Sequence, residues 1–78
     1  MEKLRYEETV YEDVRCNKFP AVFVYWPEVE RFLGEPHTGD ADQEERLVRG
    51  LLSAGAPAWV QDAVGWGDEY GWGLYRTE

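Results

Sequence analysis

The feature that most constrains the fold is a run of apolar residues, Phe19–Trp26, that is followed directly by a proline. The run is rich in β-branched and aromatic residues, which favour a strand, and we expect it to be the most buried strand of the protein. Pro27 cannot continue a central strand but suits the first turn of a helix. The sequence therefore predicts a strand that passes directly into a helix at this point.

A second strand is predicted before this run, over Leu4–Cys16. Apolar residues there fall on one parity, which is typical of a half-buried strand. Glu8 and Glu12 interrupt the apolar face and indicate a strand near an edge or one with a bulge. With a turn at Asn17-Lys18, we expect the two strands to form a hairpin. The residues predicted to face inward are Leu4, Tyr6, Val10, Val14 and Cys16.

Helical patterns follow the hairpin. The first helix carries Val29, Phe32 and Leu33 and ends at Gly34, and a capping box of Asp40 and Gln43 begins the second. The buried stripe predicted for the second helix is Leu47, Val48, Leu51 and Leu52, with Gly55 as its end. A third short helix would begin at Pro57, end at Gly65, and present Trp59, Val60, Ala63 and Val64 on one face.

The C-terminal part, from about Tyr70 to Thr77, predicts a last strand. Its alternation places Tyr70, Trp72, Leu74 and Arg76 on one face and Gly71, Gly73 and Tyr75 on the other. The predicted order is strand, strand, two or three helices, strand. We therefore expect an α+β fold in which residues 1–78 form a single domain, with a small antiparallel sheet of about three strands and helices on one face.

Charge limits the classes of partner. The chain has 16 acidic and 8 basic residues and a net charge of −8. Direct binding to nucleic acid or to an anionic membrane needs clustered Lys and Arg, so both are excluded and a basic protein surface is the natural complement. No apolar run is long enough for a membrane span and no targeting segment is recognised, so we expect a cytoplasmic protein. The single cysteine, Cys16, suits a reducing compartment or a disulfide to a second copy in a homodimer.

Catalytic and metal-binding patterns are weak. The only Ser, Ser53, and the only His, His37, lack the sequence frame of a nucleophilic triad. Asp40, Asp42 and Glu44 copy the first positions of a calcium loop, but the later positions of that loop do not match. We therefore expect no enzyme activity, no cofactor and no metal, with His37 as a solvated loop residue.

Two stretches, residues 35–45 and 50–75, contain acidic residues but no Lys or Arg. Each is either an ordinary solvated face or a contact surface for a basic partner. In the second stretch, Trp and Tyr alternate with glycine, which either fills the core or presents interface anchors. The candidate contact residues are Glu35, Asp40, Asp42, Glu44 and Glu45 in the first stretch and Trp66, Asp68, Glu69 and Tyr70 in the second.

A very short, acidic, single-domain α+β chain with aromatic patches and no catalytic constellation resembles the small phage-encoded inhibitors of bacterial defence, anti-CRISPR proteins in particular. The resemblance is one of size and charge and covers no motif, so no functional residue is carried over. It implies a DNA mimic in the bacterial host cytoplasm, whose acidic residues engage Lys and Arg of a CRISPR effector complex and prevent target DNA binding.

The sequence thus favours an inhibitor that binds a basic, nucleic-acid-handling protein or complex through an acidic surface with aromatic anchors. Three alternatives remain open at this point. The first is an antitoxin or immunity protein that neutralises a partner toxin, and the second is a small structural or adaptor subunit. The third is a small enzyme or metal protein that depends on His37.

Overall fold

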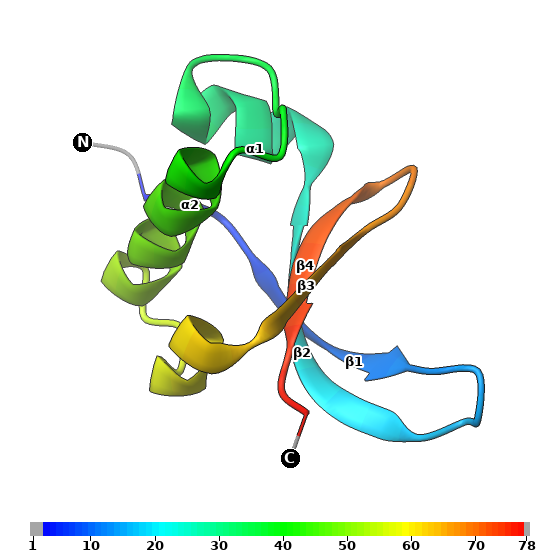
Figure 1. Cartoon of the computed structure of the whole chain (residues 1–78). Coiled ribbons are helices and arrows are strands. Elements are labelled where there is room, and N and C mark those ends of the chain that lie inside the picture. Colours follow the sequence, from blue (N-terminus) through cyan, green and yellow to red (C-terminus); the bar gives the residue numbers. More distant parts are fainter. Residues whose placement is uncertain (1–2, 78) are drawn as a thin grey trace.

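Four antiparallel strands form one sheet, and the helices cover one of its two faces (Figure 1). The computed structural model describes residues 3–77. The strand order across the sheet is β1-β2-β4-β3, so β2 and β4 are central. Along the chain the elements are β1 (Glu7–Glu12), β2 (Lys18–Tyr25), α1 (Trp26–Leu33), α2 (Ala41–Ser53), the 3-10 helix η1 (Ala58–Asp62), β3 (Val64–Gly67) and β4 (Gly71–Tyr75). The α+β class and the position of the helices agree with the sequence prediction.

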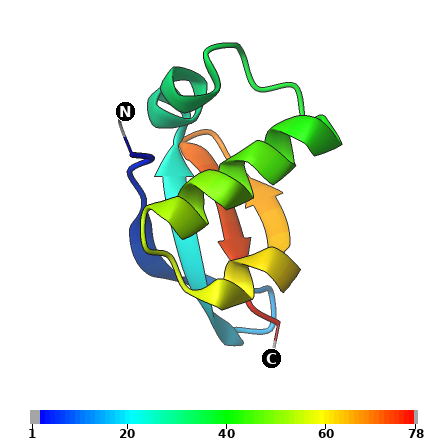
Figure 2. The ribbon, with the colours of Figure 1, turned by 90° about the vertical axis from the view of Figure 1, so that its left-hand side faces the viewer.

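The hydrophobic core lies between the sheet and the helices. Alternate residues of the two central strands point to the helix side, where Val22 and Val24 of β2 lie beside Leu74 and Trp72 of β4. Figure 2 looks onto the helix layer and shows α2 crossing in front of these strands. Each fully buried Val or Leu contributes about 1.5–3 kcal/mol, so this layer supplies most of the stabilisation. The helices, η1 and the N-terminal segment contribute Leu4, Val29, Leu33, Leu47, Leu51 and Val60 to the same core.

The helix limits largely match the sequence signals. Pro27 lies in the first turn of α1, and Gly34 ends that helix in the left-handed conformation with φ of 73°, its N–H donating to the carbonyl of Glu30. Gly55, with φ of 100°, follows the end of α2. Glycine is favoured at both points because a Cβ atom disfavours positive φ.

The capping box predicted at Asp40 does not form, although α2 does begin there. The side chain of Asp40 makes no capping hydrogen bond. Gln43 is instead only 4% exposed, and its Oε1 accepts the N–H of Thr38 at 2.8 Å. Its Nε2 donates to Glu35 Oε2 at 2.8 Å and to the Pro36 carbonyl at 3.0 Å. Gln43 therefore ties the loop between the helices to α2.

The prediction of a third helix up to Gly65 is wrong, and the sheet gains a fourth strand as a result. A short 3-10 helix ends at Asp62, and Val64–Gly67 is β3, which pairs with β4. Glycine is a poor helix former, and the two glycines of β3 gain more from pairing with β4 than from extending a helix. The local apolar spacing of Ala63 and Val64 did not reveal this pairing.

The first strand is shorter than the predicted Leu4–Cys16, and its apolar face is only partly buried. Leu4 is buried, but Val10 is 58% exposed and Val14 is fully exposed. The β1–β2 hairpin extends beyond the helix layer, so no helix covers these residues (Figure 1). The prediction that Val10 and Val14 face the core is therefore wrong.

The turn of this hairpin lies over residues 13–17, earlier than predicted. Asp13 Oδ1 accepts the N–H groups of Arg15 and Asn17, each at 2.9 Å, and Cys16 adopts a φ of 68°. The N–H of Asn17, with further help from Arg15, holds the pKa of Asp13 below its usual value. An aspartate at the start of the loop thus determines where the chain turns.

Candidate functional site: the open face of the sheet

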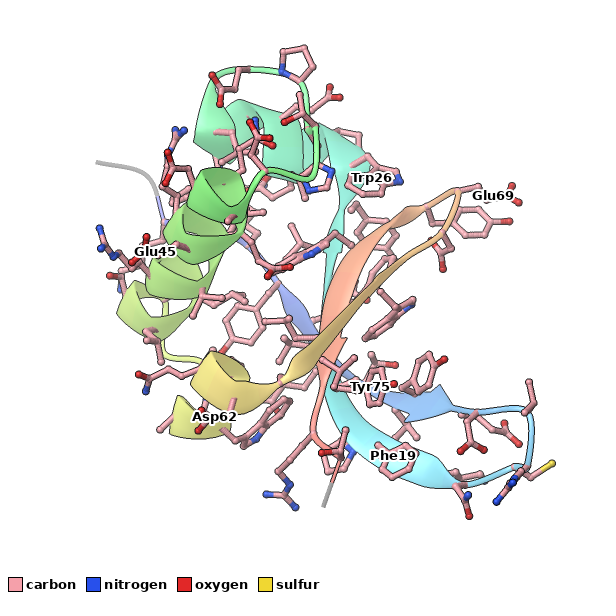
Figure 3. The ribbon with its side chains drawn as sticks, in the orientation of Figure 1. Phe19, Trp26, Glu45, Asp62, Glu69 and Tyr75 are labelled. Carbon is pink, nitrogen blue, oxygen red and sulfur yellow. The ribbon has the colours of Figure 1, made fainter. Side chains whose placement is uncertain are left out.

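The face of the sheet opposite the helices is lined by aromatic side chains. The register places Phe23 of β2 next to Gly73 of β4, and Gly73 next to Trp66 of β3, on the same side of the sheet. Figure 3 shows rings on this side, with Phe19 and Tyr75 labelled. We call this surface the aromatic face, and it consists of Tyr11, Phe19, Phe23, Tyr25, Trp66 and Tyr75.

The rings form a continuous row across all four strands. Tyr11 of β1 stacks on Tyr75 of β4, with ring centroids 4.1 Å apart and planes 7° apart. Trp66 lies 4.9 Å from Tyr11 and 6.0 Å from Phe23. Phe23 in turn meets Tyr25 edge to face at 5.2 Å. The Tyr11–Tyr75 and Phe23–Tyr25 pairs have the stacked and edge-to-face arrangements that aromatic pairs prefer, and the two Trp66 pairs are tilted.

Glycines on β4 make room for two of the rings. A Cβ at Gly73 would collide with the outer edge of the Trp66 indole, and one at Gly71 would collide with Phe23 and with the backbone of Val24. The alternation of glycine with large residues in β4 therefore has one purpose on each face. Trp72 and Leu74 fill the core, and the glycines let neighbouring rings lie across the strand on the other face.

Part of this face is open to solvent. Tyr25 is 48% exposed and Val64, which shares the face with Tyr75, is 42% exposed. The other rings are half-buried, mainly by one another. A contiguous apolar surface of this kind on a small protein typically marks an interaction site.

Acidic residues lie at the margins of the aromatic face. Glu7 shares the face with Phe23, its cross-strand partner, and its Oε1 accepts the hydroxyl of Tyr25 at 3.4 Å. At the β3–β4 turn, Glu69 and Tyr70 are exposed, as Figure 3 shows for Glu69. The carboxylate of Asp68 accepts the N–H groups of Tyr70 and Gly71 at 2.8 and 3.0 Å. Asp68 thus shapes the turn, and Glu69 remains available to a partner.

The other predicted group of acidic residues lies on the helix side, away from this face. Glu45 is at the opposite side of the molecule from Glu69 in Figure 3. Glu35 pairs with Arg46 at 3.3 Å, and Glu45 pairs with Arg49 at 2.9 Å. Asp40, Asp42 and Glu44 are exposed near the start of α2. Residues 35–45 include no Lys or Arg, but Arg46 and Arg49 in the next turn of α2 pair with two of their carboxylates.

The sequence identified Trp66 on this face but missed Tyr11, Phe23, Tyr25 and the other two rings. A usable signal exists in Phe19–Trp26, because both parities of that run are apolar and both faces of the strand therefore need a cover. The helices cover one face, and neighbouring rings cover the other only in part. Which rings meet depends on the strand order, which the sequence does not display.

The remaining candidate residues, Cys16 and His37, lie in different loops, one in the β1–β2 turn and the other between α1 and α2. Cys16 is exposed at the hairpin turn, far along the chain from His37, whose ring packs 5.0 Å from that of Trp26. Among residues 3–77, no three His, Cys, Asp or Glu side chains come together as metal ligands would. Within the same range, none of the helices has the length and apolar character needed to cross a membrane.

Comparison with protein-family models, with curated proteins and with solved structures finds no match for this chain. Function is therefore inferred from the side chains of the site alone.

Proposed function

We propose that this protein is an inhibitor that binds a basic, nucleic-acid-handling protein through the aromatic face and its acidic margins. The observation that carries the proposal is the row of six rings on the uncovered side of the sheet, in a chain of net charge −8. Trp and Tyr are enriched at the centres of protein interfaces, and carboxylates at the rim attract a positively charged partner. This is the mode of action that the resemblance to anti-CRISPR proteins implies.

The net charge also indicates which kind of molecule binds the aromatic face. Nucleic acid would be repelled, since phosphate binding needs clustered bases and the face has acidic margins instead. A second copy would bring another eight net negative charges to the same interface. A basic protein surface is attracted by the charge and can bury the rings, so it is the occupant that satisfies both properties.

The proposal is tested by capturing partners from a lysate of the host cell with the tagged protein and identifying them by mass. We then measure the affinity of the purified partner for the native chain and for Trp66→Ala, with Phe32→Ala on the helix side as the matched control. We expect roughly tenfold or greater weakening for Trp66→Ala only, as for an interface anchor. The native chain should also displace nucleic acid from the partner.

Charge reversal distinguishes the two acidic surfaces. Glu69 lies beside the aromatic face, whereas Glu45 lies on α2. We therefore expect Glu69→Lys, but not Glu45→Lys, to slow association with the partner and to reduce the salt dependence of the association rate. A partner that does not bind nucleic acid, or one that binds Trp66→Ala as tightly as the native chain, would overturn the proposal. A stable dimer in solution that buries Trp66 would show that a second copy is the occupant instead.

A further inference from the structure

At one end of the aromatic face, a hollow of about 420 Å³ lies between β1, β2 and the start of α1. Its residues include Glu7, Phe23 and Tyr25 of the aromatic face and its margin, together with Tyr6, Glu28 and Arg5. The volume falls in the range of small ligand sites, which is about 300–1,000 Å³. We propose that this hollow, here called the Glu7 pocket, receives an arginine side chain of the partner. The inference rests on the proposed function and names the group that the face recognises.

The aromatic walls of the Glu7 pocket suit a planar cation. Phe23 and Tyr25 both line the hollow, and their rings meet edge to face at 5.2 Å with planes 89° apart. Cations are attracted to the electron-rich faces of such rings, and a guanidinium can also stack on them because it is flat. The chain already makes one contact of this type, since Arg76 lies over the ring of Trp59 at 6.0 Å.

The carboxylate of Glu7 supplies the polar end of the pocket. It stands directly across from Phe23 in the β1–β2 register, it is exposed, and within residues 3–77 its recorded hydrogen bond is with the hydroxyl of Tyr25. A carboxylate can accept two parallel N–H groups of a guanidinium, which an ammonium group cannot match. The combination of perpendicular rings and one available carboxylate therefore favours arginine over lysine.

The other charged groups of the pocket are accounted for. Glu28 is already engaged, because it binds the guanidinium of Arg31 and accepts the backbone N–H of Arg5 at 3.1 Å. Arg5 also lines the pocket and is a cation of the same type as the proposed ligand. We therefore expect that removing the charge of Arg5 strengthens binding of the partner's arginine.

The test uses two short peptides of equal charge, one with arginine and one with lysine at every second position. Binding to the full chain is measured by titration calorimetry, and the site is mapped by the shifts of backbone amide NMR signals. We expect the arginine peptide to bind at least about fivefold more tightly than the lysine peptide, with the largest amide shifts at Glu7, Phe23 and Tyr25. Equal affinity of the two peptides, or shifts centred on the start of α2, would overturn the inference.

Four variants, two of them controls, make the test specific to the pocket. Glu7→Gln should weaken the arginine peptide about three- to fivefold, the range of an exposed ion pair, whereas the matched control Glu30→Gln on α1 should not. Arg5→Ala should strengthen binding, and Arg49→Ala on α2 controls for the general loss of a positive charge. No gain with Arg5→Ala beyond that of Arg49→Ala would count against the pocket. All four side chains are exposed, so the fold should be retained, and circular dichroism checks this.

The pocket and the proposed function can fail separately. If Trp66→Ala abolishes binding of the captured partner but Glu7→Gln and the arginine peptide show no effect, the Glu7 pocket is wrong and the aromatic face stands. If neither Trp66→Ala nor Glu7→Gln changes the affinity of the captured partner, the face itself is wrong.

Discussion

Single glycines determine how the aromatic face is arranged. Gly73 lies under the outer edge of Trp66, and the rings of Tyr11 and Phe23 lie on either side of that indole. The absence of one Cβ atom thus allows three strands to share a row of rings. In β3, by contrast, a Cβ at Gly67 would meet Trp26 only at ordinary contact distance, 3.5 Å.

This difference gives a residue-scale prediction. Gly73→Ala should displace Trp66 and destabilise the protein by about 1–3 kcal/mol, the usual cost of overpacking. Gly67→Ala is the matched control and should be neutral or slightly stabilising, because alanine restricts the unfolded chain more than glycine does. Urea unfolding gives the free energies, and the Trp66 indole NMR signal reports the displacement. Equal stability of the two variants would show that Trp66 can move without cost.

At the scale of elements, local residues set the ends of α1, and the buried side chain of Gln43 joins α2 to the preceding loop. The glycine that ends α1 and the proline in its first turn are local, and the sequence alone predicted both. Gln43 is different, because its amide joins α2 to the loop that precedes it, including the N–H of Thr38 and the carbonyl of Pro36. The sequence suggested an ordinary capping role for Gln43, whereas the fold uses it as a buried link.

Replacing this link should have a larger effect than a surface change. Gln43→Ala removes the hydrogen bonds from the buried amide to Glu35, Pro36 and Thr38 and should lower the free energy of unfolding by about 1–3 kcal/mol. Gln61→Ala, an exposed glutamine of η1, is the control and should change it by no more than about 0.5 kcal/mol. Hydrogen exchange at Thr38 should accelerate in Gln43→Ala. Protection at Thr38 equal to that of the native chain would show that the link is not needed.

At the scale of the whole molecule, the free energy of unfolding depends on pH because a carboxylate that is paired in the folded state can be protonated. The guanidinium of Arg31, together with the backbone N–H of Arg5, holds the pKa of Glu28 below its ordinary value of 4.5. A carboxylate with a lowered pKa in the folded state stabilises the fold above its unfolded pKa. That contribution is lost as the pH falls through 4.5 and then through the lower folded value.

Glu28→Gln should therefore be less stable than the native chain at pH 7, and the difference should shrink as the pH falls below about 4.5. Glu30→Gln on the same helix controls for the loss of one negative charge. Urea midpoints measured over a pH series give both curves. A constant difference between Glu28→Gln and the native chain at all pH values would mean that the ion pair does not cause the effect.

Features that depend on neighbours along the chain can be predicted from the sequence alone. Pro27 and Gly34 delimit α1, and the alternation in β4 separates Trp72 from Gly73, because φ preferences and the two-residue period of a strand act locally. The net charge of −8 is likewise fixed by composition, and with it the class of partner that we propose.

The positions at which carboxylates and aromatic rings meet depend on the tertiary structure. β3 forms because it pairs with β4. That pairing brings Trp66 close to Tyr11, which lies 55 positions earlier in the chain. The same folding pairs Glu35 with Arg46 and leaves Glu7 beside Tyr25. Contacts between strands far apart in sequence depend on burial and register, which no local pattern encodes.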